Sequence, residues 1–247
     1  MPEPERTLVI VPTYNEISSL ETIVRRIRAS VPAADVLVVD DASPDGTGAL
    51  ADRLASADPA IRVLHREGKD GLGRAYLAGF AHALAQGYAF IVEIDADGSH
   101  DPAELPRMLE LARTADLVIG SRWVDGGAVR NWPWLRQAIS RAGNAYSRAV
   151  LRSRIRDITA GFRVFTADAL RSLHLDDVSS QGYCFQVELA WHTERSGRTV
   201  VEHPIVFVER TTGQSKMHLG IVIEALVRVT WWGIAALFGG AGPGSSR

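Results

Sequence analysis

The sequence predicts an α/β protein in which a mainly parallel central sheet is flanked by helices. Five short apolar runs alternate with segments of helical periodicity along the first half of the 247-residue chain. The runs are continuous, which is typical of strands buried on both faces. Strands joined by helices of this length form parallel sheets with right-handed crossovers. The composition agrees with one large globular domain, because 46% of the residues are hydrophobic and 23% are charged.

The expected strands and helices follow one another in order. The helical segments are identified by apolar residues that recur every three or four positions, as at Leu20, Ile23 and Ile27. Strands are predicted at residues 8–11, 36–39, 61–64, 89–94 and 117–119, with shorter ones near 161–165 and 200–208. Helices are predicted around residues 20–28, 47–57, 73–87, 133–151 and 184–196.

The C-terminal part of the chain is apolar but does not have the pattern of a membrane span. Residues 219–238 are long enough to cross a bilayer, but Glu224 and Arg228 interrupt them, four residues apart and able to pair on one helix face. We therefore expect a globular domain over residues 1–217, an amphipathic helix over 218–238 and a disordered tail over 239–247. Two placements of the helix are open: in the plane of a membrane interface, or folded back onto the domain.

Several classes of protein are excluded by composition. A single cysteine, Cys184, cannot form an internal disulfide, and the N-terminal segment has no basic region followed by an apolar stretch. We therefore expect a protein on the cytoplasmic side of the membrane. A formal net charge of −2 argues against nucleic-acid binding. The histidines show no zinc-like spacing.

Polar residues stand where four of the predicted strands end. They occupy residues 12–16, 40–41, 95–97 and 120–122. Ligands of open parallel sheets bind at the carboxyl ends of the strands, so we expect the site there. Asp95 and Asp97 are the most informative pair, because two carboxylates one residue apart can both turn toward a hard divalent cation such as Mg²⁺.

The roles of the neighbouring acidic and glycine-rich segments are less specific. Either Asp40 or Asp41 could accept from a nucleobase or ribose, while the other caps the following turn. Residues 68–73 superficially resemble a phosphate loop, but their spacing matches neither nucleotide-binding fingerprint. We interpret them as a turn that leads into a helix.

Eight short motifs carry a resemblance to a known family. They stand in order along the chain, over about residues 7–217: VPTYNE, DDASPDGT, DADGSH, GSR, NWP, TAGFR, GYCFQ and ER with GQSKM. The chain resembles the family 2 glycosyltransferases of the GT-A fold. Within them it is similar to the dolichyl and polyprenyl-phosphate mannose synthases, most of all to the actinobacterial polyprenol monophosphomannose synthases.

The resemblance implies a set of site residues. Catalytic roles fall to Asp95, Asp97, Arg122 and Arg210. Nucleotide-sugar binding falls to Pro12, Tyr14, Glu16, Val39, Asp41, Asp95, Ala96, Asp97, Arg210 and Lys216. Asp95 and Asp97 would hold Mg²⁺ or Mn²⁺. Ser99 stands where many relatives have a glutamine ligand, and its shorter side chain would act through water.

An arginine-rich stretch fits a second anionic substrate. Residues 122–156 contain eight arginines and one acid, Asp125, which gives a local charge of +7. We assign Arg122 and Arg136 to the phosphate of the lipid acceptor, and interpret the other arginines as charge that faces an anionic membrane.

The expected activity is inverting transfer of mannose from GDP-mannose to polyprenyl phosphate at the membrane surface, with a membrane protein as a further partner to be tested. The acceptor is a phosphate that is mostly dianionic at neutral pH, so we expect no general base. Two alternatives are open: use of another sugar nucleotide such as UDP-glucose, and a non-catalytic nucleotide-binding scaffold. The stretch 210–217 is the expected lid over the donor.

Overall fold

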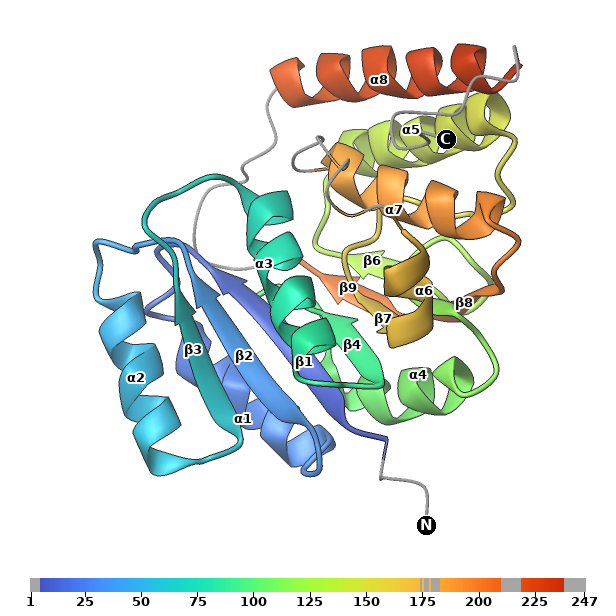
Figure 1. Ribbon diagram of the computed structural model, residues 1–247. Helices are drawn as coiled ribbons and strands as arrows, with labels where there is room; N and C mark the ends of the chain where they lie inside the picture. Colours follow the sequence, from blue (N-terminus) through green and yellow to red (C-terminus); the bar gives the residue numbers. More distant parts are fainter. Residues whose placement is uncertain (1–4, 174, 176–177, 179–182, 210–218, 238–247) are drawn as a thin grey trace.

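The computed structural model describes residues 5–173, 175, 178, 183–209 and 219–237, and shows a central sheet between two layers of helices (Figure 1). Seven strands of the described part form the sheet in the order β3-β2-β1-β4-β7-β5-β8. Their bounds are β1 Thr7–Thr13, β2 Asp35–Asp40, β3 Ile61–His65, β4 Phe90–Glu93, β5 Leu117–Ser121, β7 Arg163–Thr166 and β8 Val200–Pro204. A separate parallel pair is formed by β6 Ala128–Arg130 and β9 Val206–Val208.

Helices cover both faces of the sheet because the side chains of each strand alternate between them. Leu8 and Ile10 of β1 point into the core beneath α3, α6 and α7, whereas Val9 and Val11 pack toward α1, α2 and α4. The bounds are α1 Leu20–Ser30, α2 Thr47–Ala57, α3 Leu72–Ala85, α4 Leu105–Ala112, α5 Trp134–Leu151, α6 Ala167–Ser172, α7 Tyr183–Arg195 and α8 Leu219–Leu237, with a 3₁₀ turn, η1, at Pro102–Glu104.

The predicted fold class is confirmed, and the first four strands are all parallel. The structure adds one reversal, because β7 is antiparallel to both β4 and β5. The apolar stretch near 200–208 is divided into β8 and β9, and Ile205 between them is buried. The helices α4 and α6 were not expected. Gly71, with a φ of 95°, precedes α3, as the interpretation of residues 68–73 as a turn requires.

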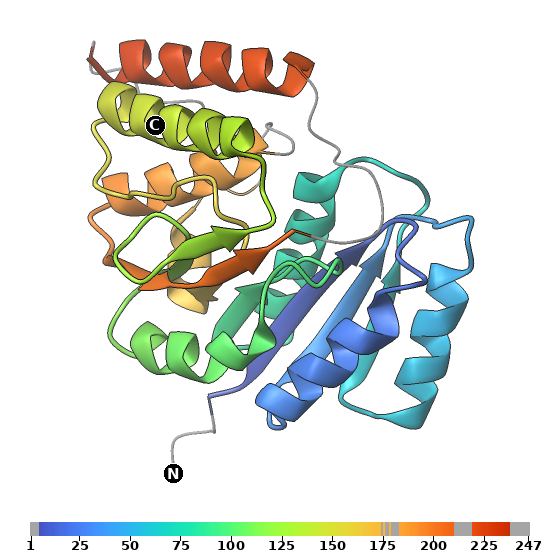
Figure 2. The same ribbon diagram turned by 180° about the vertical axis from the view of Figure 1, so that it is seen from behind.

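The helix α8 is folded back onto the domain. It lies along α5 and over α7 in both ribbon views (Figures 1 and 2). Val229 and Trp232 are buried, and the Trp232 ring stacks on Trp191 with 6.1 Å between centroids. The Tyr146 and Thr230 hydroxyls are 2.6 Å apart, which ties α8 to α5.

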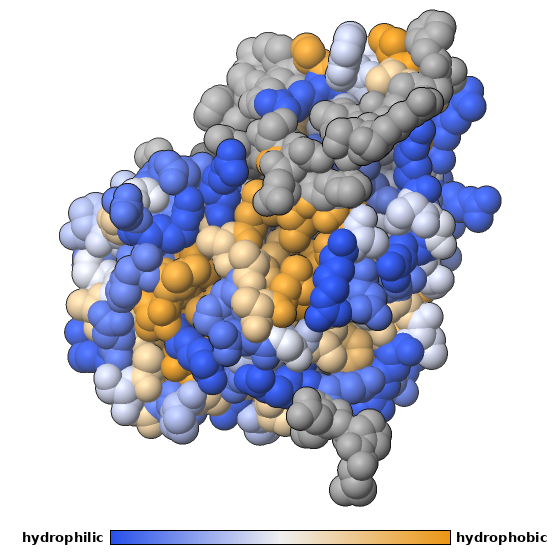
Figure 3. Space-filling view, viewed as in Figure 1, coloured by the Kyte–Doolittle hydropathy of each residue, from blue (hydrophilic) through white to orange (hydrophobic). Residues whose placement is uncertain are grey.

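The opposite face of α8 carries apolar side chains that nothing in the described structure covers. Val227, Trp231 and Ile234 are 63%, 65% and 45% exposed. Apolar atoms reach the surface at the upper edge of the space-filling view, where α8 lies (Figure 3). In the described part, no helix has both the length and the apolar character that crossing a bilayer demands.

A buried charged pair joins β4 to the reversed strand. Glu93 and Arg163 are both fully buried, with Nε of Arg163 3.9 Å from a Glu93 oxygen. The guanidinium also donates to the carbonyls of Ile158, Ala160 and Gln186, each at 2.8 Å. Burial raises the pKa of Glu93 to about 8, and the nearby Arg163 opposes that rise only in part.

Glu93 makes the stability of the fold depend on pH. A raised pKa means that the folded state retains a proton that the unfolded chain releases above about 4.5. The contribution of protonated Glu93 to the free energy of unfolding is therefore fully present below about pH 4.5. It is lost as the pH rises through about 8. We expect Glu93→Gln to lose less free energy of unfolding than the wild type between roughly pH 5 and pH 9 in urea titrations. Glu110→Gln, at an exposed site on α4, should follow the wild type, and a Glu93→Gln curve parallel to both would contradict the assignment.

Candidate functional site

The loops after β1 and β2 are fastened to each other by a carboxylate. Asp40 accepts from the Thr13 hydroxyl at 2.9 Å, from the Ser43 hydroxyl at 2.6 Å and from the Ser43 N–H at 3.1 Å. The Glu16 N–H donates to the Thr47 hydroxyl at 3.0 Å, which adds a second link. Of the two roles considered for the acidic pair, Asp40 therefore takes the turn.

Asp41 lies beside this turn and is paired with a cation. Its carboxylate is 2.5 Å from Nη1 of Arg66, and the residue is only 4% exposed. Burial raises the pKa of Asp41, while the Arg66 charge works in the opposite direction. Close by, the ammonium of Lys69 lies 4.1 Å from the centre of the Tyr14 ring. Lys69 was missed, because its loop was interpreted only as a turn.

The predicted donor-binding residues of these two strands lie side by side. Pro12 and Val39 are neighbours in the β1–β2 register, and both are buried. Glu16 is partly exposed, and one of its carboxylate oxygens accepts from the Ser19 hydroxyl at 3.0 Å. The carboxyl ends of β1, β2 and β3 thus bring together the Tyr14 ring, the Lys69 ammonium and three carboxylates, those of Glu16, Asp40 and Asp41.

Asp95 and Asp97 follow β4, next to β1 in the sheet. Both are partly exposed, whereas Ala96 between them is 3% exposed, so the two carboxylates leave the strand end on the accessible side. The Tyr76 hydroxyl lies 3.4 Å from Oδ1 of Asp95, and Oδ1 of Asp97 accepts from the Ser99 N–H at 3.0 Å. Ser99 itself is 3% exposed.

Asp95 and Asp97 fit a hard divalent cation whose other ligands come from a substrate and from water. Among the residues that the structure describes, no three His, Cys, Asp or Glu side chains are grouped to hold a metal. Two carboxylates are nevertheless the usual protein contribution where substrate phosphates and water complete the shell of Mg²⁺.

His100 follows the two aspartates and lies against β9. It is 3% exposed, and its ring packs against Phe162 and Phe207 with centroid distances of 5.3 and 5.1 Å. Burial lowers the pKa of His100 to about 4, which keeps the ring neutral at pH 7 although Asp97 acts in the opposite direction.

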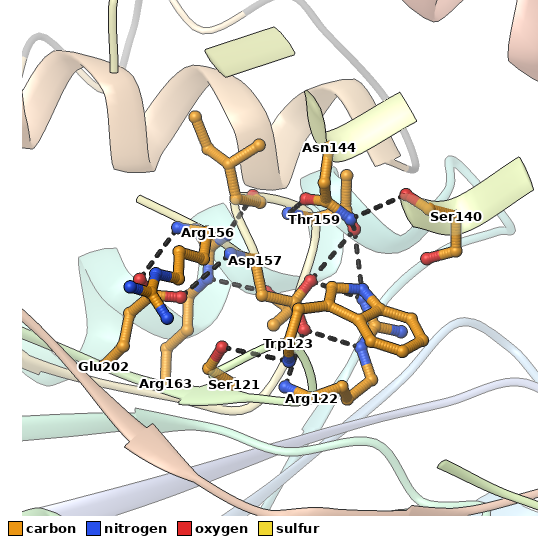
Figure 4. A network of polar contacts seen from close by, with 12 residues as sticks. Ser121, Arg122, Trp123, Ser140, Asn144, Arg156, Asp157, Thr159, Arg163 and Glu202 are labelled. Atoms are coloured by element: carbon orange, nitrogen blue, oxygen red, sulfur yellow. Dashed lines mark hydrogen bonds and ion pairs between the residues drawn. The ribbon is translucent and has the colours of Figure 1, made fainter. Parts of the chain in front are cut away.

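Arg122, at the end of β5, is held in a buried ion pair (Figure 4). Its Nε and Nη2 donate to the two Asp157 oxygens at 2.7 Å, and its N–H donates to the same carboxylate at 2.8 Å. Nη2 also donates to the Thr159 hydroxyl at 3.0 Å. The carbon of the guanidinium is 5.6 Å from the centre of the Phe207 ring, so Arg122 and His100 flank one aromatic ring.

Arg136, in the first turn of α5, forms a different pair. Its Nη1 contacts the Glu209 carboxylate, and its guanidinium lies 4.2 Å from the Trp132 ring centre. Glu209 also donates its N–H to the Arg130 carbonyl, at the end of β6. Arg210 and Lys216, the expected lid over 210–217 and the tail over 239–247 lie outside the described residues.

Sequence reasoning missed the partner of Arg122. That partner, Asp157, directly follows the arginine-rich stretch 122–156. It is fully buried, and its N–H donates to the Glu202 carboxylate at 2.8 Å. An acid next to an arginine-rich stretch indicates that an ion pair can form there. The sequence does not indicate that its partner is Arg122, 35 residues away.

We expect Asp157→Asn to destabilise the protein strongly, because it leaves the Arg122 charge buried without its carboxylate. Breaking such a pair costs about 3–5 kcal/mol, which chemical denaturation measures directly. Asp168→Asn is the control, since its pair with Arg171 is exposed and worth less than about 1 kcal/mol. If Asp157→Asn prevents folding, Thr159→Val, expected to cost about 1 kcal/mol, tests the same network. Equal losses in Asp157→Asn and Asp168→Asn would refute the role of the pair.

Comparison with known proteins identifies the family. The sequence model described as Glycosyl transferase family 2 matches residues 8–174. An undecaprenyl-phosphate mannosyltransferase of Micrococcus luteus is 57% identical over 235 residues, which are 95% of this chain and 97% of that protein. A polyprenol monophosphomannose synthase of Mycolicibacterium smegmatis is 53% identical over 232 residues, or 93% and 88% of the two chains.

Solved structures with lower identity show the same fold. A glucosyl-3-phosphoglycerate synthase of Mycobacterium tuberculosis in complex with UDP has a TM-score of 0.65 at 20% identity, over 96% of this chain and 82% of that one. A mannosyltransferase of Pyrobaculum calidifontis in complex with GDP-Man and Mn²⁺ has a TM-score of 0.54 at 19% identity, over 98% and 76%. The chain therefore has the GT-A fold and belongs to glycosyl transferase family 2.

Proposed function

We propose that this glycosyltransferase moves mannose from GDP-mannose to the phosphate of a polyprenyl phosphate. The proposal is carried by the two relatives above 50% identity, whose names specify mannose transfer to polyprenyl phosphate and whose lengths match this chain. The grouping of acids at the β1, β2 and β4 ends and of arginines at β5 and α5 supports it.

The donor would lie across the carboxyl ends of β1, β2 and β4. Pro12, Tyr14, Glu16, Val39 and Asp41 would hold the nucleoside. Asp95 and Asp97, with the backbone of Ala96 between them, would face the diphosphate and hold Mg²⁺ or Mn²⁺, with Ser99 acting through water. When bound, such a cation stabilises negative charge on the departing diphosphate. Arg210 and Lys216 would add cationic contacts to the same group.

The acceptor chemistry needs charge and orientation, not proton removal. An oxygen of the lipid phosphate attacks the anomeric carbon while the bond from that carbon to the diphosphate breaks, and the bonding electron pair leaves with GDP. A phosphate that is mostly dianionic at neutral pH can do this without a base. Arg122 and Arg136 would hold it, and a single in-line displacement would convert the α-linked donor into a β-mannosyl phosphate.

A lipid acceptor requires contact with a membrane surface. Two helices that pack against each other carry exposed apolar side chains: Trp134, Leu135 and Ile139 on α5, and Val227, Trp231 and Ile234 on α8. Tryptophan is favoured at the level of lipid headgroups. We place the protein peripherally on the cytoplasmic face, with α8 both packed on the domain and directed toward lipid, and with a membrane protein as a further candidate partner.

Transfer of radiolabel from GDP-mannose into an organic-extractable lipid tests the reaction. We expect transfer with polyprenyl phosphate, its loss with EDTA, its recovery with Mg²⁺ or Mn²⁺, and a loss of at least about a hundredfold in Asp97→Asn. The product should be β-linked by NMR, and an α-linked product would exclude single displacement. Transfer from UDP-glucose but not GDP-mannose would change the donor, and absence of metal-dependent transfer from either would leave a binding scaffold.

Arg136→Ala tests the acceptor assignment. We expect the KM for polyprenyl phosphate to rise about tenfold and the KM for GDP-mannose to change little, because one charge-assisted contact to the acceptor is lost. Glu209→Gln is the matched control: it breaks the same ion pair but keeps the arginine, so it should not raise the KM for the lipid. A similar rise in both constants would contradict the assignment of Arg136 to the acceptor.

A further inference from the structure

A pocket lined by arginines lies outside the residues assigned to donor and acceptor, except for Arg122 in its wall. Its volume is about 320 Å³, and it lies between α5 and the segment that follows β5. Figure 2 shows α5 crossing above the small sheet of β6 and β9 on this side of the molecule. The lining residues are Arg122, Trp123, Val124, Gly127, Arg141, Asn144, Ala145, Arg148 and Arg156. None of the predicted nucleotide-binding or metal-binding residues lines it.

The pocket carries more positive charge than its acids neutralise. Asp157 is committed to Arg122, and Asp125 is fully exposed with one oxygen 3.9 Å from Arg156. No carboxylate of the described residues lies within 4.0 Å of a nitrogen of Arg141 or Arg148. Glu202 accepts from the backbone N–H of Arg156 at 2.8 Å, so the four arginines have three carboxylates near them. Arg141 and Arg148 stand on the same side of α5, seven residues apart.

The side chains of the pocket include guanidinium groups and an amide, which are donors of the kind that phosphate oxygens accept from. The Arg141 guanidinium lies 4.6 Å from the centre of the Trp123 ring, within the range of a cation–π contact. Asn144, which lines the pocket, is buried and donates to the Thr159 hydroxyl at 3.2 Å (Figure 4). This hydrogen bond joins the pocket to the buried network of Arg122 and Asp157. Guanidinium groups bind phosphate oxygens in pairs, and the volume is within the range of small-ligand sites.

The surroundings favour a lipid headgroup as the source of that phosphate. On the same helix, Trp134 is 78% exposed and stands seven residues before Arg141, on the side of the pocket, while α8 packs along α5 and exposes Val227, Trp231 and Ile234. Apolar side chains next to arginines are typical of surfaces that enter the headgroup region of an anionic membrane.

We propose that this pocket binds the phosphodiester headgroup of an anionic membrane phospholipid, at a site separate from the one for the polyprenyl phosphate. The proposal deepens the proposed function and rests on it for the membrane location. It gives the enzyme a second point of contact with lipid, so that the bilayer fixes the orientation of α5.

Vesicle sedimentation of the full-length protein tests the pocket. We expect tighter binding to phosphatidylcholine vesicles that contain phosphatidylglycerol than to phosphatidylcholine alone. The double variant Arg141→Gln/Arg148→Gln should lose about tenfold in affinity for the anionic vesicles, and little for the neutral ones. The double variant Arg152→Gln/Arg154→Gln removes the same charge from exposed positions near the end of α5 that do not line the pocket, and should lose less than about threefold.

The other outcomes overturn the proposal. Equal losses in the two double variants would mean diffuse surface charge and no pocket. Calorimetric binding of inorganic phosphate, abolished by Arg141→Gln/Arg148→Gln while vesicle binding is unchanged, would assign the pocket to a soluble anion. A raised KM for polyprenyl phosphate in detergent, again with unchanged vesicle binding, would place the acceptor there. Vesicle binding needs no nucleotide sugar, so a failure of mannosyl transfer leaves this measurement intact.

Discussion

The buried ion pair between Arg122 and Asp157 is the interaction on which the arrangement of the site depends. It joins the end of β5 to the segment before β7, and Glu202 of β8 accepts from the N–H of Asp157 on the other side. Through Thr159 and Asn144 the same network reaches α5. Burying two charges is costly, and the cost is offset here because the carboxylate receives several hydrogen bonds. An arginine that is already oriented and desolvated loses little conformational freedom when an anion approaches it.

The helix α5, which this network reaches, makes different contacts on its different sides. Its buried side, at Asn144, Ser147 and Leu151, faces the domain. One flank meets α8 through Tyr146, and the other carries Arg141 and Arg148 over the arginine pocket. A helix of 18 residues has room for these separate contacts because residues three, four and seven apart share a side. The hydrogen bonds that connect Arg122 and Asp157 to Asn144 through Thr159 therefore also fix the position of α5, the helix that would meet lipid.

The part of the fold that could be predicted from sequence is the part governed by local patterns. Continuous β-branched runs marked β1 and β2, and Asp95 and Asp97 were identified because the strand before them ends at a known edge of the sheet. The reversal of β7 has no such signal, since the buried Arg163 of this strand meets Glu93 and the Gln186 carbonyl, which are far from it in the sequence. Lys69 against Tyr14 and Asp157 against Arg122 are likewise pairings across long sequence separations, which periodicity does not encode.

The same distinction explains the two placements considered for the C-terminal helix. Residues 219–238 are apolar but include the charged Glu224 and Arg228, and that pattern suits either a membrane interface or packing on the domain. The structure shows that Trp232 packs inward on Trp191 while Trp231, the next residue, points out and is 65% exposed. Adjacent residues of a helix face different directions, so one tryptophan can fix the helix to the domain while the other is available to lipid. The two placements are therefore compatible, because a helix that is fastened along one side can present its other side to a membrane without leaving the domain.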